Sequence, residues 1–446
     1  MEPRKRIAFL SEHASPLASL GGEDAGGQNV YVAQVSRNLA ELGYDVDVFV
    51  RGDGTEPEIV TWLPHVRVVH LQVGPPRFLL KDQLWPLMPA FRDAFLDFTR
   101  ATETSYDLIH SNFWMSGWVA AELKRRLDMP VVHIFHATGI TKRRHQGEAD
   151  TSPDGRIEIE KQIVREVDRI LAQCPAEVEE LMAEYGANPA KIVVTPAGVD
   201  LERFHPIPQA EARQELGLDP NAFIIVYVGR MVPRKDVRNI VRALPHLLRA
   251  NCRRPIRLLV VGGESETPDP ELTPEIGVLQ KLAAALGVAD HVLFTGARPS
   301  PELYKYYGAG DVAVTTPWYE PFGLTPLEAM ACGRPVVGSR VGGIQFTVRE
   351  GVTGLLVPPK NPVALATALR RFLGEEWLAP AMGKLARQRV ERSFSWPSVS
   401  ARIAQVYGSL LAEAHLATPE RAPGTRHPTP GNIPVPGTTK VTHGAD

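Results

Sequence analysis

The chain has 446 residues, of which 44% are hydrophobic and 22% charged, a composition typical of soluble globular proteins. Its 49 Lys and Arg against 51 Asp and Glu leave a formal charge of −2, which argues against binding to duplex nucleic acid or anionic membranes. Cys174, Cys252 and Cys332 lie far apart, so we expect neither a disulfide framework nor a cysteine zinc site. No apolar run suits a signal peptide or a spanning helix, and we therefore expect a cytoplasmic protein without stable membrane association.

Short apolar runs alternate with segments of helical periodicity along the first half of the chain. The helical segments include Asn29–Leu42 and Ala176–Tyr185. The apolar runs are poor in polar residues, as in strands that helices cover on both faces. The strands expected here are Ile7–Leu10, Val46–Val50, Val66–Leu71, Leu108–His110, Val131–Phe135, Ile170–Ala172 and Ile192–Thr195.

The second half repeats this rhythm. One sheet holding the strands of both halves would exceed the usual size of a twisted open sheet. We therefore predict an α/β protein with two facing Rossmann-like domains, each a doubly wound parallel sheet, and a cleft between them at the carboxyl ends of the strands. The strands expected in the second half are Phe223–Val228, Ile256–Val261, Val292–Phe294, Val312–Thr315, Val336–Val337 and Leu355–Val357.

Proline and glycine without periodicity mark the break between the domains, near Pro196–Pro220. We place the first domain at 1–205 and the second at 206–394. The segment 395–417 has the pattern of one last amphipathic helix, which starts at Pro397. The rest of the chain, 418–446, is rich in proline and glycine and is predicted to be disordered.

A glycine-rich segment, Gly21–Val32, follows the first expected strand and opens the first long helix. Gly26 and Gly27 would let backbone N–H groups approach an anion, and the N-terminus of the helix favours a phosphate there. The alternative is a flexible glycine turn without a ligand. The segment is neither a dinucleotide fingerprint nor a P-loop.

Two cations follow the first strand of the second domain, in the segment Gly229–Asp236. Arg230 and Lys235 lie between a strand end and a helix, which is a position suited to clamping a diphosphate. The alternative is that both are solvated surface cations.

The segment Glu320–Glu328 carries two carboxylates eight residues apart. Thr325 is predicted to cap a short helix with Pro326 as its first residue, which makes Glu328 the reciprocal half of a capping box in the structural interpretation. Glu320 lies before that helix and has no capping role. In the functional interpretation, the two carboxylates bind hydroxyl groups of a ligand in the cleft.

Histidines and a basic cluster follow strands of the first domain. His136 comes directly after the expected strand Val131–Phe135, and His13 follows the first expected strand. Open sheets build their sites at these strand ends, although a single histidine is more often structural. The cluster Lys142–His145 comes shortly after His136. Such a charge run is usually a solvated face, but beside a cleft it would hold an anionic substrate.

At these residues the chain resembles the retaining glycosyltransferases of family 4, which have the GT-B fold. The resemblance covers about Arg6 to Ala414, and its most specific part is Glu320–Pro359. The segments SEHASPL and GGEDAGGQNVYV narrow it to the branch that contains sucrose and sucrose-phosphate synthases and inositol-phosphate glycosyltransferases. The resemblance implies transfer of a hexosyl group, with retained configuration, from a nucleotide-diphosphate sugar such as UDP-glucose to a small sugar, polyol or sugar-phosphate acceptor.

The resemblance also implies roles for individual residues. The catalytic residues would be His136, Arg230, Lys235 and Glu320. The donor would be bound by Gly26, Gly27, Arg230, Lys235, Glu320, Phe322, Gly323, Leu324 and Glu328, with the two cations on the diphosphate and Glu328 on the ribose. The acceptor would be bound by His13, Asn29, Lys81, Lys142 and Arg156.

Two positions depart from the inositol-phosphate relatives. Phe113 stands where a tyrosine is expected, and Ala137 stands where a hydroxyl residue is expected. Both positions help to hold the acceptor phosphate in those relatives. We therefore rank a hexose phosphate above inositol phosphate as acceptor, with a neutral sugar close behind.

We expect no metal and no cofactor besides the nucleotide sugar, because Arg230 and Lys235 supply the positive charge. Asp45 and Asp47 form an Asp-x-Asp that leads into a strand and is predicted to lie at the surface. The expected partners are the nucleotide sugar and a small acceptor, and the oligomeric state stays open. The alternatives are a non-hydrolysing sugar-nucleotide epimerase, which would act without an acceptor, and an inactive nucleotide-sugar-binding protein.

Overall fold

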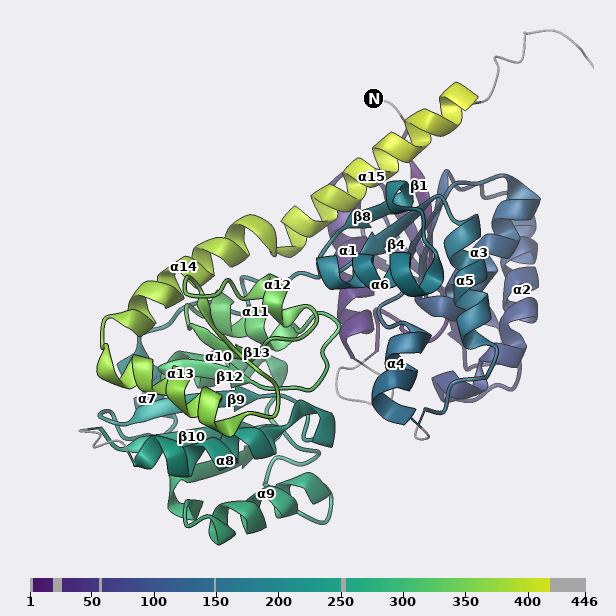
Figure 1. The fold of residues 1–446 in the computed structure, drawn as a ribbon. Coiled ribbons are helices and arrows are strands. Elements are labelled where there is room, and N and C mark those ends of the chain that lie inside the picture. Colours follow the sequence, from purple (N-terminus) through teal and green to yellow (C-terminus); the bar gives the residue numbers. More distant parts are fainter. Residues whose placement is uncertain (1–2, 19–25, 56–57, 148–149, 250–253, 418–446) are drawn as a thin grey trace, which may run out of the picture.

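The computed structural model describes residues 3–18, 26–55, 58–147, 150–249 and 254–417. Two β-sheets covered by helices lie side by side, and a long C-terminal helix reaches from one to the other (Figure 1). This confirms the predicted α/β architecture with two domains. The predicted disordered tail at 418–446 and part of the glycine-rich segment, 21–25, lie outside the described residues.

The first sheet has eight strands in the order β3-β4-β2-β1-β5-β6-β7-β8. All neighbouring strands are parallel except β3 and β4, so the prediction of a wholly parallel sheet is wrong at this edge. Only two residues, Pro64 and His65, connect β3 to β4, and so short a connection allows only antiparallel pairing. The strands are β1 (Arg6–Leu10), β2 (Asp45–Gly52), β3 (Glu58–Leu63), β4 (Val66–Gln72), β5 (Leu108–Asn112), β6 (Val131–Ile134), β7 (Arg169–Ala172) and β8 (Ile192–Val194).

The second sheet has six strands, all parallel, in the order β11-β10-β9-β12-β13-β14. Each of them was expected from the sequence, with ends that differ by no more than two residues. The strands are β9 (Phe223–Val228), β10 (Ile256–Val261), β11 (Val292–Gly296), β12 (Val312–Thr315), β13 (Val336–Ser339) and β14 (Gly354–Val357). The first sheet ends at Val194 and the second begins at Phe223, while the boundary at 205/206 stays a prediction.

Helices cover both faces of each sheet. Along β1, Ile7 and Phe9 belong to one apolar core while Ala8 and Leu10 belong to another, because alternate residues of a strand point to opposite faces. The first domain contains α1 (Gly27–Glu41), α2 (Met88–Ala101), α3 (Phe113–Leu127), α4 (Gly139–Gln146), α5 (Arg156–Glu166) and α6 (Pro175–Tyr185). The remaining helices are α7 (Gln209–Glu215), α8 (Val237–Leu248), α9 (Pro274–Ala285), α10 (Leu303–Ala309), α11 (Leu324–Ala331), α12 (Ile344–Thr347), α13 (Pro362–Gly374), α14 (Leu378–Ser393) and α15 (Trp396–Ala417).

The last helix, α15, crosses from the second domain back to the first, as the resemblance implies (Figure 1). It packs along α1, and the Tyr407 hydroxyl forms a buried hydrogen bond with the His110 imidazole of β5. Arg169 of β7 pairs with Glu413 further along the helix. In the part of the chain that is described, no helix combines the length and apolar character needed to cross a bilayer.

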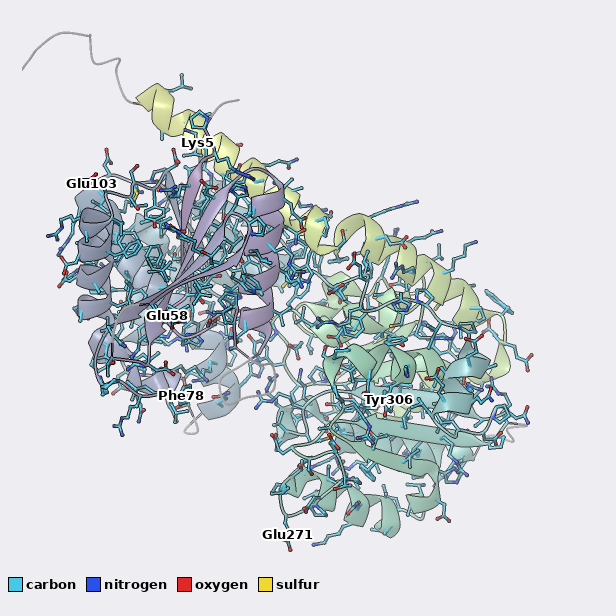
Figure 2. All side chains as sticks on the ribbon, turned by 180° about the vertical axis from the view of Figure 1, so that it is seen from behind. Lys5, Glu58, Phe78, Glu103, Glu271 and Tyr306 are labelled. Atoms are coloured by element: carbon cyan, nitrogen blue, oxygen red, sulfur yellow. The ribbon has the colours of Figure 1, made fainter. Side chains whose placement is uncertain are left out.

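In the first domain, the residues that precede the parallel strands lie at one end, and the carboxyl ends of these strands lie at the opposite end. Lys5 precedes β1 and Glu103 precedes β5, and both lie at one end of the domain, whereas Phe78, which follows β4, lies at the other (Figure 2). Loops that follow strands of both domains line common cavities, which places the candidate site between the two sheets.

Candidate active site

Two charged side chains from separate strand ends meet at the carboxyl edge of the second sheet. Lys235 ends a 3₁₀ turn, Pro233–Lys235, that follows β9, and Glu320 lies between β12 and α11. The Lys235 ammonium contacts Glu320 Oε2 directly, and both side chains are mostly buried, with exposed fractions of 14% and 13%. Arg230 lies on the same loop, and its exposed guanidinium pairs with no described carboxylate. The structure therefore brings three of the predicted catalytic residues to one strand edge.

Paired glycines hold the backbone around Glu320. The N–H of Gly343 donates to the Glu320 carbonyl at 3.1 Å. A Cβ on Gly342 would lie 2.1 Å from that carbonyl oxygen, and one on Gly343 would lie 2.4 Å from Phe322 Cα. Phe322 itself points into the core, where its ring centroid lies 6.3 Å from that of Phe394. Sequence reasoning missed these glycines, although their pairing within the most specific motif was the available signal.

The helix α11 begins earlier than the sequence predicted. Gly323, rather than Thr325, occupies the position before the helix, so the predicted cap at Thr325 with Pro326 as first residue is wrong. Gly323 has a φ of 84°, a left-handed conformation that glycine adopts without strain, and this lets the chain enter the helix sooner. Glu328 is consequently the fifth helical residue, too far along for a capping box. Gly333 follows the end of the helix, as predicted.

Glu328 has a different intramolecular partner. The Tyr307 hydroxyl of α10 donates to Glu328 Oε2 at 2.9 Å, and the other oxygen of Glu328 accepts from no described residue. Burial raises the pKa of Glu328, while the Tyr307 hydrogen bond and the charges of Lys235 and Arg203 oppose that shift. The carboxylate is thus fixed on one side and open on the other, as a ligand-binding group requires. Tyr307 orients this carboxylate, and the sequence analysis did not find it.

The first domain presents His136 to this edge. Its backbone φ of 59° is left-handed, and its Nε2 lies 3.0 Å from Asn112 Oδ1. Because the Asn112 amide donates to the Leu10 carbonyl, Oδ1 is the side that accepts from His136. Burial lowers the pKa of His136 to about 3, and the nearby His133 and His13 add to the effect. The imidazole is therefore neutral, with Nδ1 left to accept a hydrogen bond.

The glycine-rich segment brings the start of α1 to the start of α11. Leu324 Cδ1 of the second domain lies 3.6 Å from where a Cβ on Gly27 would be. The Gly26 N–H donates to Asn29 Oδ1 at 2.9 Å, and the Asn29 amide donates to the Ser15 carbonyl at 3.0 Å. Both helices thus direct their positive ends toward the cleft, which suits a diphosphate. Asn29, a predicted acceptor residue, fixes the entry to α1 in this structure.

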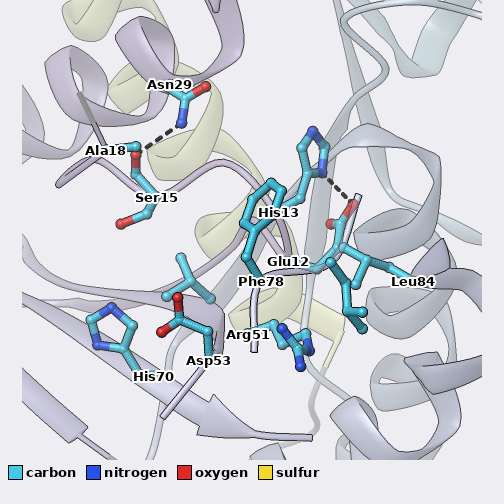
Figure 3. A pocket seen from close by; sticks show the side chains of 12 residues that line it. Glu12, His13, Ser15, Ala18, Asn29, Arg51, Asp53, His70, Phe78 and Leu84 are labelled. Carbon is cyan, nitrogen blue, oxygen red and sulfur yellow. Dashed lines mark hydrogen bonds and ion pairs between the residues drawn. The ribbon is translucent and has the colours of Figure 1, made fainter. Parts of the chain in front are cut away.

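Figure 3 shows a cavity of about 210 Å³ in the first domain, lined by two of the predicted acceptor residues, His13 and Asn29. His13 Nδ1 lies 2.8 Å from Glu12 Oε1, which orients its ring. Asp53 and His70 line the same cavity and bring further polar groups to it. The cavity therefore joins the predicted acceptor residues to groups that the sequence did not single out.

The other predicted acceptor residues, Lys81, Lys142 and Arg156, line a second cavity of about 240 Å³, which we call the interdomain cavity. Lys142 Nζ lies 2.9 Å from Asp150 Oδ1, and Arg156 Nε lies 2.8 Å from Glu160 Oε1. Lys142 and Arg156 are therefore each paired with a carboxylate of the first domain.

A smaller cavity of about 50 Å³ also lies between the domains, and His136, Glu177 and Tyr319 are among its lining residues. Burial raises the pKa of Glu177 to about 7, and the charge of Glu180 acts in the same direction. The sequence analysis did not identify Glu177, because nothing in the pattern of α6 distinguishes it from the neighbouring glutamates.

The Asp-x-Asp sequence is not a surface feature. Asp47 is buried and accepts from Arg67 Nε at 2.7 Å and from the Tyr106 hydroxyl at 2.6 Å, so the prediction of a surface position is wrong for this residue. Asp45 is half-buried, with Arg4 and His65 nearby. Within the described residues, no three His, Cys, Asp or Glu side chains cluster in a way that could hold a metal ion.

The two facing α/β domains, with charged groups at opposed strand edges, define a GT-B glycosyltransferase. Family models agree with this over nearly the whole described chain. The model described as Glycosyltransferase Family 4 matches residues 25–203, and the model described as Glycosyl transferases group 1 matches residues 208–389. The chain belongs to glycosyltransferase family 4.

Curated relatives and solved structures support the same assignment. The D-inositol 3-phosphate glycosyltransferase of Actinosynnema mirum is 39% identical, covering 91% of this chain and 97% of that protein, and its Streptomyces bingchenggensis counterpart is 38% identical, covering 91% and 90%. The sucrose-phosphate synthase of Thermosynechococcus elongatus superposes with a TM-score of 0.79 at 36% identity, covering 92% of this chain and all of that one. HepE from Anabaena, solved with UDP, has a TM-score of 0.71 at 20% identity over 91% of this chain and all of that one, a likeness of fold.

Proposed function

We propose that this glycosyltransferase moves a hexosyl group from a nucleotide-diphosphate sugar, UDP-glucose or similar, to a hydroxyl of a small acceptor, with retained configuration. The observation that carries the proposal is the contact between Lys235 and Glu320 at the carboxyl edge of the second sheet. Arg230 lies on the same loop as Lys235. The contact sets a cation for the diphosphate beside a carboxylate for sugar hydroxyls.

The reaction breaks the bond between the anomeric carbon and the phosphate oxygen, and the electron pair leaves with the diphosphate. The acceptor oxygen bonds to the same face of the anomeric carbon, and its proton passes to the departing phosphate oxygen. Arg230 and Lys235 stabilise the negative charge of that leaving group, which is the main contribution that such a site can make. His136, neutral because its pKa is about 3, contacts the donor sugar through its free Nδ1.

The acceptor in this proposal is phosphorylated. Two observations support it: the names of the similar proteins specify inositol 3-phosphate and sucrose phosphate, and Lys81, Lys142 and Arg156 line one cavity. We place a hexose phosphate ahead of inositol phosphate, because Phe113 and Ala137 carry no hydroxyl to bind an inositol-linked phosphate. A neutral sugar is the next candidate.

The first prediction concerns the two cations. We expect Arg230→Ala and Lys235→Ala each to lower turnover of the nucleotide sugar by about 10²- to 10³-fold, the scale for removing one group that stabilises transition-state charge. The products, analysed by NMR, should keep the anomeric configuration of the donor.

The matched control is Lys281→Ala, which removes an exposed lysine of α9, remote from the predicted donor site in sequence. Its turnover should stay within about twofold of wild type, the expectation for an exposed side chain away from the site. Wild-type turnover in both Arg230→Ala and Lys235→Ala would contradict the proposed function.

The second prediction is that transfer needs no divalent metal. Arg230 and Lys235 take the place that a metal ion has in other transferases that act on diphosphates. Activity should therefore persist in excess EDTA. Loss of activity that magnesium or manganese restores would overturn this part of the proposal.

A further inference from the structure

Cations from both domains line the interdomain cavity. Lys81, Lys142 and Arg156 come from the first domain, and Arg234 comes from the 3₁₀ turn of the second. Among the described residues that line the cavity there is neither an aspartate nor a glutamate. A cavity lined in this way is complementary to an anion.

The guanidinium of Arg234 has N–H donors that are available to a ligand. Its Nη1 lies 3.8 Å from Glu320 Oε2, whereas the Lys235 ammonium contacts that same oxygen directly. The guanidinium donates no hydrogen bond to any described residue. Arg156 differs, because it donates to Glu160, Ser152 and the Ala137 carbonyl. Arg234 is therefore the better placed of these two arginines to bind a ligand.

Aromatic side chains form much of the wall around these cations. Phe113 of the first domain and Trp318 and Tyr319 of the second line the cavity. The backbone N–H of Trp318 donates to the Arg234 carbonyl at 3.0 Å, which ties the 3₁₀ turn to this wall. Lys360 Nζ lies over the Trp318 ring, 4.3 Å from its centroid. Aromatic walls exclude water and strengthen a charge-assisted hydrogen bond inside the cavity.

We propose that Arg234, which belongs to the second domain, is a specificity-determining residue that binds the anionic group of the acceptor. The inference rests on the proposed function, and it extends the acceptor site across both domains. A phosphate held between Lys142 and Arg234 links the two domains, whereas the neutral form of the same acceptor gains nothing from Arg234.

The test compares wild type, Arg234→Ala and Arg234→Lys, as full chains, with UDP-glucose as donor. The acceptors are glucose 6-phosphate, fructose 6-phosphate and inositol 3-phosphate, each with its dephosphorylated form. We expect Arg234→Ala to lower kcat/KM for the best phosphorylated acceptor by about 10- to 100-fold, mainly through KM, and to change the neutral form by less than about twofold. Arg234→Lys should recover part of the loss, and the affinity for UDP, measured by calorimetry, should stay unchanged.

The matched control is Arg371→Ala, which removes a half-exposed arginine whose Nε lies 3.9 Å from Glu375 Oε1, and it should leave both acceptors unaffected. An equal loss with both acceptor forms would overturn the inference by assigning Arg234 to the donor, and so would no loss at all. A wild type that uses both forms equally would overturn the inference while leaving hexosyl transfer intact. A wild type that transfers to no acceptor would contradict the proposed function itself.

Discussion

At the scale of single residues, the difference between expectation and structure is clearest at Glu328. The sequence pattern fits a capping box, but the positive φ of Gly323 starts α11 early and turns Glu328 toward Tyr307. A glycine that allows left-handed backbone competes with the capping preference of Thr325, and this competition cannot be read from spacing alone. The residue types of the site were predictable, whereas their local backbone was not.

The third prediction separates the structural and ligand roles of Glu328. In Glu328→Gln the amide oxygen can still accept from the Tyr307 hydroxyl, so thermal stability should change little. Affinity for UDP should fall by about 1.5–3 kcal/mol, because a charged acceptor of a ribose hydroxyl becomes neutral. Isothermal calorimetry measures this. Unchanged affinity would leave Glu328 with its Tyr307 contact alone, and Glu391→Gln on α14 serves as the control.

Backbone strain is a second feature of single residues that the sequence does not reveal. Phe113, His136 and Asp236 all have positive φ, at 71°, 59° and 49°, and all follow strands at the cleft. Such conformations are uncommon outside glycine and tend to gather at functional sites. Asp236 caps α8 in this way without a side-chain hydrogen bond to the helix.

At the scale of elements, apolar runs were sufficient to locate the parallel strands. The central parallel strands are buried on both faces, so their sequences contain apolar runs that stand out. The strand β3 lacked that signal, because it is a half-exposed edge strand in which threonine and glutamate interrupt the apolar residues. Other edge strands, such as β14, keep a continuous apolar run, so the exposure of β3 on both faces is what hid it.

The fourth prediction tests how α15 is attached to the first domain. In Tyr407→Phe the buried His110 loses the hydroxyl that contacts its Nδ1, and its Nε2 already has no partner among the described residues. Leaving a buried polar group without a partner costs about 1–3 kcal/mol. Urea unfolding should show this loss. The control is Tyr44→Phe, whose hydroxyl makes only a 3.5 Å contact with the Ala404 carbonyl, and an equal loss in both variants would contradict the assignment.

At the scale of the whole molecule, the sequence predicted two domains and a cleft but not which side chains meet there. Lys235 and Glu320 are 85 residues apart, and Gly27 and Leu324 lie in different domains. The strand-end rule limits the site to loops at one edge of each sheet. Pairing across the cleft depends on how the two sheets face each other, which follows from packing between domains and along α15 rather than from any local pattern.

The last prediction concerns the dependence of global stability on pH. Glu177 lies in the smaller cavity between the domains, where burial raises its pKa to about 7, above the ordinary value of 4.5. Between these two values the unfolded chain releases a proton that the folded chain keeps, so folding stability falls as pH rises through this window. Glu177→Gln cannot ionise, and its amide oxygen can still accept from the Gln173 N–H.

We therefore expect Glu177→Gln to match wild type in urea unfolding at pH 5 and to be more stable at pH 8 by about 1–3 kcal/mol. Glu179→Gln, an exposed change on the same helix, should show no such dependence. The carboxyl group of Glu177 is buried in a cavity between the domains that disfavours its charge. Part of the free energy of folding is therefore lost above neutral pH. A stability difference that is the same at both pH values would show that Glu177 acts through packing and not through its proton.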